Sequence, residues 1–299
     1  GGADEVQMRA LLESARGGGA AREADDALAA GRFDEASEKY RALGSGKLES
    51  RTVLSMLSAL ALSKQHAACA RTAVEQLPSL KAVSDRAAAL GWGLDCAVEM
   101  APGAERDAAL PVLVREADAA LSLPGIIPDD ASGLYELLVG ERQAAKDDAG
   151  ARAIAARWLA FLDGEAAKAK SSSERAVFDA HRVNAALAAG VPERMVAPLQ
   201  RSEKDHPRDY NPPARLALVY QAMGRTDDGL RAIDRALPLC TEGPRRLRLL
   251  ETKAGLLEKK GDAAGRRKTL EEALAHARKL PRAQVKPGRI EAIEALLAK

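Results

Sequence analysis

Aromatic residues are scarce in this sequence, where they make up only 3% of the 299 residues. Strands favour aromatic and β-branched side chains, so this scarcity, combined with abundant Ala, Leu, Glu and Arg, argues against a sheet-rich protein. No stretch approaches the roughly 18 uninterrupted apolar residues that a membrane-spanning helix needs. Apolar residues still amount to 46%, which is enough to form a hydrophobic core. The composition therefore predicts an all-α protein.

Motifs for catalysis and for metal binding are also lacking. The three cysteines form neither a Cys-x-x-Cys pair nor a zinc-binding spacing. The four histidines are scattered without a His-Glu-x-x-His arrangement, and no Gly-x-Ser-x-Gly elbow occurs. We therefore expect no catalytic residue, no metal site and no cofactor, and we predict that the protein is not an enzyme.

The small net charge of +2 conceals an asymmetry along the chain. Residues 201–299 contain 22 Lys and Arg against 14 Asp and Glu, whereas residues 1–200 contain 23 against 29. A basic C-terminal third could attract an acidic partner, the alternative being a set of solvated, Arg-rich helix faces. Nucleic acid is not expected as a partner, because no aromatic residues for base stacking are interleaved with the basic clusters at 245–248 and 266–268.

A repeating pattern is the main positive signal. Between residues 206 and 241, apolar residues recur at helical spacing, stop at Gly224 and resume on a second helix. Equivalent turns are predicted at Gly31, Gln65, Gly190, Gly224 and Gly261. The steps from 31 to 65 and from 190 to 224 both measure 34 residues. This pattern resembles the tetratricopeptide repeat, which has the same period.

The resemblance implies a right-handed α-α solenoid of about seven tetratricopeptide-like helical hairpins over residues 20–299. Residues 287–298 are expected to form a C-terminal capping helix over the last repeat. Residues 1–19 are expected to be a separate segment, with an N-terminal helix at 3–15 followed by a Gly-rich linker. A candidate seam between two stacks lies near 123–129, where Pro and Gly interrupt the helical pattern.

In the middle of the chain the period loosens, but the pattern remains helical. One hairpin is expected to pair residues 84–100 with 104–122, and another to pair 130–145 with 148–169. The consecutive aspartates Asp129 and Asp130 are predicted to act as the N-cap of the second of these hairpins.

A stack of helical hairpins forms a concave surface lined by the first helix of each hairpin, and such surfaces bind peptides or folded partners. Asn and Arg side chains there can hold a peptide backbone or a carboxylate by directed hydrogen bonds. The alternative is ordinary solvated helix surface. The register of the repeats predicts these partner-binding residues: Arg22, Asp25, Asn184, Asn211, Gln221, Arg248 and Glu251.

Two of the cysteines fall on helices that a solenoid would stack against each other. Cys69 is expected on the second helix of one hairpin and Cys96 on the first helix of the next. Neighbouring helices can bring Cα atoms within disulfide range. We therefore regard a Cys69–Cys96 disulfide as one hypothesis and two separate, small buried thiols as the other. The pattern leaves the redox state of Cys240 open.

Several short stretches are more specific than a helical repeat requires, and together they resemble the helical region that follows the thioredoxin domain in a group of exported bacterial thioredoxin-family proteins. The resemblance covers roughly residues 20–285, in the order in which these motifs occur: Gly93-Leu94-Asp95-Cys96, 129–135, 158–167, Phe178-Asp179-Ala180-His181-Arg182, 209–215 and Gly243-Pro244-Arg245.

This resemblance implies that the chain is the partner- or substrate-presenting region of a thioredoxin-like protein, located in the periplasm or otherwise exported. In that compartment a Cys69–Cys96 disulfide could persist. The thioredoxin domain itself, with its Cys-x-x-Cys motif, is absent from this sequence, so no dithiol chemistry is assigned to any residue.

The leading hypothesis is accordingly a non-catalytic module that binds a protein or peptide along the concave face. An alternative is an enzyme with a pocket between the middle hairpins, at residues 129–182. Another alternative is a structural spacer or oligomerisation element. An enclosed pocket around Asp179 and His181 would favour the enzyme.

The disulfide hypothesis makes the first testable prediction. Protein prepared under oxidising conditions, then denatured and alkylated without reduction, is expected to leave Cys69 and Cys96 unmodified, since a disulfide offers no thiolate to the reagent whereas two buried thiols would react once unfolded. Intact mass after alkylation, with and without prior reduction, measures the difference. Modification of both residues in unreduced protein would contradict the disulfide.

Overall fold

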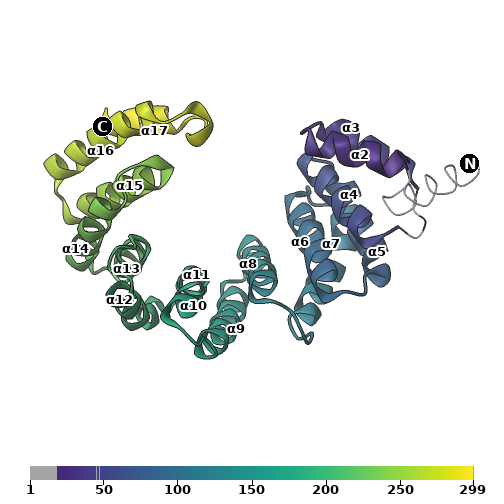
Figure 1. The fold of residues 1–299 in the computed structure, drawn as a ribbon, viewed down its shortest axis with the longest axis horizontal. Helices are drawn as coiled ribbons and strands as arrows, with labels where there is room; N and C mark the ends of the chain where they lie inside the picture. The colour runs from purple at the N-terminus through teal and green to yellow at the C-terminus, as the bar shows by residue number, and fades with distance from the viewer. Residues whose placement is uncertain (1–18, 45, 47, 299) are drawn as a thin grey trace, which may run out of the picture. The chain divides into compact units, whose positions relative to one another are not determined.

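The computed structural model describes residues 19–44, 46 and 48–298 (Figure 1). Its described residues form an all-α solenoid of helical hairpins and contain no strand. Among these residues no helix is long and apolar enough to cross a membrane. The helix expected at residues 3–15 lies outside the described part of the chain.

The chain forms two compact units, Gly1–Asp148 and Ala149–Lys299. We refer to them as unit 1 and unit 2. The segment 123–129, where a seam was predicted, lies inside unit 1 and comprises the end of a loop and the first two residues of the helix that follows it. The predicted hairpin of 130–145 and 148–169 corresponds to two helices on either side of the boundary between the units.

The described residues of unit 1 form three helical hairpins followed by a single helix. Within it α2 packs on α3, α3 on α4, α5 on α6 and α6 on α7, while α6 also contacts α8. The bounds are α2 (Gly19–Ala29), α3 (Phe33–Ala42), α4 (Ser50–Leu62), α5 (His66–Gln76), α6 (Val83–Glu99), α7 (Ala104–Ala120) and α8 (Pro128–Ala144).

Unit 2 continues with helical hairpins and ends in a single helix that packs on the last of them. The bounds are α9 (Asp148–Ala167), α10 (Ser172–Ala176), α11 (Asp179–Ala189), α12 (Val196–Asp205), α13 (Asn211–Ala222), α14 (Thr226–Ala236), α15 (Gly243–Lys260), α16 (Ala263–Lys279) and α17 (Arg289–Leu297). The predicted cap at 287–298 is α17.

The turns inside the hairpins follow the predicted glycines, with one exception. Gly31, Gly190, Gly224 and Gly261 all have positive φ angles, between 72° and 79°. In the α4–α5 hairpin the residue with positive φ is Lys64, at 60°, whereas the turn was predicted at Gln65. The prediction was one residue late because this hairpin has no glycine to mark the left-handed position, which a lysine occupies against its steric preference.

The start of α8 also differs from the prediction. Asp129 and Asp130 do not form the N-cap, because the helix begins at Pro128 with Ile127 as its N-cap residue. Proline suits the first helical position, since its fixed φ is already helical and its missing N–H has no partner to lose there. The two aspartates lie in the first turn, where their negative charge is favourable to the helix dipole.

Hairpins of unit 1 approach each other closely at the contact between α5 and α6. Gly93 of α6 is buried, and a Cβ on it would come within 2.5 Å of the Cβ of Ala73 on α5. At the same contact Cys69 and Cys96 are buried, with their Cα atoms 6.2 Å apart and their sulfur atoms bonded to each other. Cys240, in unit 2, is a buried free cysteine, and burial raises the pKa of its thiol.

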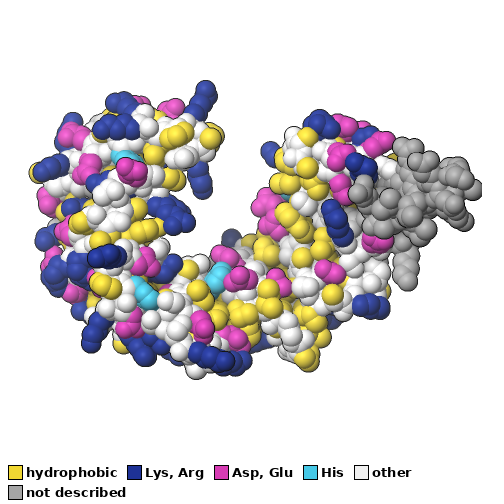
Figure 2. Space-filling model, in the orientation of Figure 1, with side chains coloured by type: hydrophobic (Ala, Val, Ile, Leu, Met, Phe, Trp, Pro, Cys, Tyr) yellow, Lys and Arg dark blue, Asp and Glu magenta, His cyan; other side chains and the backbone are white. Residues whose placement is uncertain are grey.

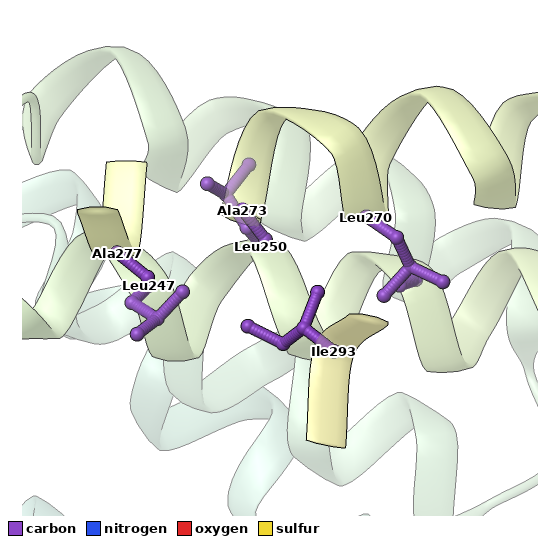
Figure 3. Packing of buried hydrophobic residues seen from close by; sticks show 7 residues of the cluster. Leu247, Leu250, Leu270, Ala273, Ala277 and Ile293 are labelled. Carbon is purple, nitrogen blue, oxygen red and sulfur yellow. The ribbon is translucent and has the colours of Figure 1, made fainter. Parts of the chain in front are cut away.

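The last hairpin of unit 2 is covered by α17. Ile293 is only 2% exposed and points into an apolar cluster made by α15 and α16 (Figure 3). The members of this cluster are Leu247, Leu250, Ala254, Leu270, Ala273, Ala277 and Ile293. α17 therefore buries apolar surface that the α15–α16 hairpin would otherwise expose.

The close approach of α5 and α6 gives the second prediction. Gly93→Ala is expected to destabilise the fold by about 1–3 kcal/mol, because its methyl group would overlap the side chain of Ala73. Gly91→Ala, two residues away on α6, has open space and is expected to be neutral or to stabilise the helix by up to about 1 kcal/mol. Urea unfolding of both variants measures the difference. Equal effects of the two substitutions would show that the contact is not tight.

Candidate binding face

The first helices of three successive hairpins lie next to one another in unit 2. α11 contacts α13, and α13 contacts α15, whereas α12, α14 and α16 make no comparably extensive contacts with one another. In Figure 1 the helices α11, α13 and α15 accordingly lie side by side along one edge of this unit. We call their outward side the first-helix face, defined by Asn184, Asn211, Leu218, Gln221, Arg248 and Glu251.

The turn glycines place side chains at equivalent positions on these helices. Asn184 and Leu218 each stand six residues before a turn glycine, and Asn211 and Arg248 each stand thirteen residues before one. On α13 the residues Asn211, Leu218 and Gln221 follow helical spacing, so they form one stripe. The register of the repeat therefore determines which positions lie on the first-helix face.

Two of the predicted residues on this face are exposed, and their side chains form no hydrogen bond or ion pair with the described residues. They are Asn184 on α11 and Arg248 on α15. Arg248 keeps a guanidinium group with five N–H donors available for a carboxylate. Asn184 offers both a donor and an acceptor to a peptide backbone.

The other predicted residues in unit 2 already contact neighbours. The side-chain Nδ2 of Asn211 donates to Oδ1 of Asp209 over 2.7 Å. Glu251 accepts a hydrogen bond from Nε of Arg289 over 2.9 Å, which links α15 to α17. Gln221 lies over α15, since its Nε2 atom is 3.5 Å from the place where a Cβ on Gly255 would stand. The side chains of Asn211, Gln221 and Glu251 are therefore held by neighbouring residues of unit 2. Their role in partner binding stays a prediction.

The two predicted residues of unit 1 lie on α2. Arg22 is exposed, whereas Asp25 accepts a hydrogen bond from the hydroxyl of Tyr40 on α3. Tyr40 is completely buried, and burial together with this hydrogen bond raises the pKa of its hydroxyl. Asp25 thus has a structural partner inside its own hairpin.

Sequence reasoning missed the exposed apolar residues of this region. Leu218, in the centre of α13, is 40% exposed, and Val177, just before α11, is 68% exposed. The signal was present, because Leu218 occupies the same turn-relative position as Asn184, and Val177 the same position as Asn211 and Arg248. The face therefore combines apolar and polar side chains.

A buried carboxylate, that of Asp179, lies in the first turn of α11. Asp179 is 1% exposed and its Oδ2 accepts a hydrogen bond of 2.6 Å from the hydroxyl of Ser202 on α12. Its Oδ1 has no hydrogen-bond partner, and the nearest cation is Arg182, at 3.7 Å. Burial is the main influence on this carboxyl group and raises its pKa. Arg182 in turn binds Asp163, which Arg194 also contacts.

Unit 2 is basic and unit 1 is acidic. Residues 149–299 contain 29 Lys and Arg against 19 Asp and Glu, whereas residues 1–148 contain 16 against 24. On the face shown in Figure 2, many Lys and Arg side chains lie over α12 to α16. On α15, Glu251 and Glu258 are each paired with an arginine, which leaves the charge of Arg248 uncompensated locally.

Comparison with known proteins identifies the fold. A tetratricopeptide repeat protein from Parabacteroides merdae aligns over 93% of this chain and 96% of its own, with a TM-score of 0.56 and 10% identity. The C-terminal part of a TPR repeat-containing protein from Cytophaga hutchinsonii aligns over 88% and 97%, with a TM-score of 0.50 and 10% identity. The fold is tetratricopeptide-like. No protein-family model matches the sequence, and no curated protein matches it significantly.

In the part of the chain that is described, no group of three or more His, Cys, Asp or Glu side chains could hold a metal ion. Asp179 contacts Ser202 and Arg182, and His181 lies against Trp158, with 6.3 Å between the ring centres. The enzyme alternative at residues 129–182 stays untested.

The buried carboxylate gives the third prediction. Because burial raises the pKa of Asp179, the folded state binds a proton more readily than the unfolded state, and its relative stability rises as pH falls. The free energy of unfolding of the wild type, relative to that of Asp179→Asn, is therefore expected to increase as the pH is lowered from 7 to 4. Urea unfolding at intermediate pH values measures this trend.

Asp228→Asn is the matched control with the opposite sign. A hydrogen bond from Arg225 lowers the pKa of Asp228, so the stability it contributes is lost as pH falls. The wild type is expected to lose stability relative to this variant only as pH falls to 3.8, the ordinary pKa of an aspartate, and below, so this comparison should show no gain for the wild type between pH 7 and pH 4. The same pH trend in both comparisons would contradict the assignment for Asp179.

Proposed function

We propose that the protein is a non-catalytic binding module that holds an acidic, extended segment of a partner protein on the first-helix face. The observation that carries this proposal is the set of exposed side chains on adjacent first helices, with Arg248, Leu218 and Asn184 lying free of internal partners on α15, α13 and α11. The tetratricopeptide-like fold supports a protein partner at the level of architecture.

Each of these side chains suits one part of a peptide. Arg248 can pair with a carboxylate in a two-pronged geometry. Leu218 offers apolar surface to an aliphatic side chain. Asn184 can donate to and accept from a peptide group. The reaction is reversible association without a covalent step.

The distance across the first-helix face, from α11 to α15, determines how many residues of the partner's segment the face can hold. Packed helices lie about 8–10 Å apart, so the distance from α11 to α15 is about twice that. An extended chain spans about 3.3 Å per residue, so about six residues would reach across. The excess of basic residues in unit 2 favours an acidic segment and speeds its encounter with the face.

The same proposal places the protein outside the cytoplasm, as the partner-presenting region of a thioredoxin-family protein. Its support is the sequence resemblance together with the sulfur atoms of Cys69 and Cys96, which are bonded in the structure. Disulfides persist in oxidising compartments and are rare in the cytosol.

Binding of a fluorescein-labelled octapeptide of alternating Glu and Leu tests the proposal. Arg248→Glu is expected to weaken binding by at least about tenfold, because it replaces attraction by repulsion on the α15 side of the face. Leu218→Ser is expected to weaken it by about three- to tenfold through loss of apolar contact. Fluorescence polarisation at low and at physiological salt measures both effects, and binding should be weaker at the higher salt.

Lys268→Glu is the matched control, since it makes the same charge change on α16, away from the first-helix face. This variant is expected to bind almost as well as the wild type. An octapeptide with Lys in place of Glu should not bind. Equal losses for Arg248→Glu and Lys268→Glu would show that only the net charge of unit 2 matters, and would overturn the assignment to this face.

A further inference from the structure

A hollow of about 680 Å³ lies in unit 1, between two neighbouring hairpins. One wall is the turn from α4 to α5 with the first residues of α5, and the other is the turn from α6 to α7 with the first residues of α7. This hollow is separate from the first-helix face, which belongs to unit 2. Its volume is of the size that holds a small molecule.

Basic side chains gather around this hollow although unit 1 as a whole is acidic. The lining contains Lys64, His66, Arg71 and Arg106, against two carboxylates, Glu99 and Glu105. Arg71 is paired with Glu105 over 3.2 Å, and both side chains are more than half exposed. Arg106 and Lys64 form no ion pair with the described residues, so positive charge predominates.

Two nitrogen atoms of this lining have no partner. Nε of Arg106 and Nδ1 of His66 are both closed off from solvent, and neither forms a hydrogen bond. Polar atoms in such positions are normally hydrogen-bonded, and an unpaired one calls for an explanation. Both belong to residues that line the same hollow, one from each wall.

The backbone adds to the positive potential. α5 and α7 both begin at the hollow, and neither has a side chain capping its first N–H groups. Unpaired N–H groups at a helix start favour anions, and the dipoles of the two helices act in the same direction. This contribution supplements the basic side chains and the unpartnered nitrogens.

An apolar extension adjoins the hollow. A smaller space of about 270 Å³ between α5 and α7 shares Ala67, Arg71 and Glu105 with the larger one. The rest of its lining consists of the small or apolar side chains of Val74, Ala108 and Ala109 together with Glu75, whose side chain is exposed. An anionic head next to the basic side chains would therefore have room for an aliphatic tail beside it.

We propose that this hollow in unit 1 binds a small molecule with an anionic oxygen head group, carboxylate or phosphate, and a short aliphatic tail. The head group accepts hydrogen bonds from the terminal Nη atoms of Arg106, from Nε2 of His66 when it carries a proton, and from the first N–H groups of α5 and α7. The tail lies between α5 and α7. Glu105 competes with the ligand, because it neutralises Arg71 at the junction of the two spaces.

Isothermal titration of the full chain with acetate, hexanoate and hexyl phosphate tests this proposal, with chloride at equal ionic strength as the blank. Hexanoate is expected to bind more tightly than acetate because only its tail reaches the apolar space. A comparison of hexanoate with hexyl phosphate distinguishes a carboxylate from a phosphate head. No binding of any of the three probes above the chloride blank overturns the proposal.

Two substitutions should act in opposite directions on the better of the two hexyl probes. Arg106→Gln is expected to weaken binding by about tenfold, through loss of a charge-assisted hydrogen bond. Glu105→Gln is expected to strengthen it by about two- to fivefold, because Arg71 is released from its exposed ion pair. Arg115→Gln removes a 69% exposed charge from the same helix without touching the hollow and should have no effect.

Circular dichroism and thermal unfolding of each variant check that it folds, and Arg71→Gln replaces Arg106→Gln if the latter does not. Equal loss of binding in Arg106→Gln and Arg115→Gln would contradict a site in this hollow, as would weaker binding in Glu105→Gln. Failure of the octapeptide experiment on unit 2 leaves this result unaffected, since the two sites share no residue.

Discussion

The structure depends on how closely neighbouring helices can approach one another. Where α5 meets α6, Gly93 faces Ala73 with no space for another methyl group, and in unit 2 a Cβ on Gly229 would stand 2.9 Å from Leu256. Small side chains at these crossings let the backbones come together and exclude water without large aromatic groups. The scarcity of aromatic residues and the abundance of alanine thus follow from one requirement of the packing.

This packing gives the two sides of each helix different roles: one side packs against neighbouring helices and the other faces solvent. Once alanines and leucines are committed to the crossings, the outward positions are free to vary, and the repeat places them in register on α11, α13 and α15. The result in unit 2 is a face where Leu218 and Arg248 stay exposed, while Glu251 and Asn211 are held by Arg289 and Asp209. In unit 1 the starts of two helices instead enclose a basic hollow.

Local features of the chain were predictable from the sequence because they depend on neighbouring residues. Helical periodicity and turn glycines located the hairpins, and α17 was recognised as a cap. The turn position at Lys64 was not predicted, because a lysine side chain does not favour a positive φ. The hydrogen bond from Ser202 to Asp179 could not be predicted from the sequence, since it joins residues 23 positions apart whose side chains meet only after α11 and α12 pack. The basic hollow likewise requires two turns that sequence alone does not bring together.

The capping helix also bears on how such a chain could change its number of repeats. Ile293 occupies the surface of α15 and α16 on which a further hairpin would stack. Duplication of a hairpin inside unit 2 would leave α17 in place over the last pair, whereas a new hairpin after α16 would have to displace it. An increase in repeat number by internal duplication is therefore compatible with this architecture. Addition of a hairpin after α16 is opposed by the contacts between α17 and the last hairpin.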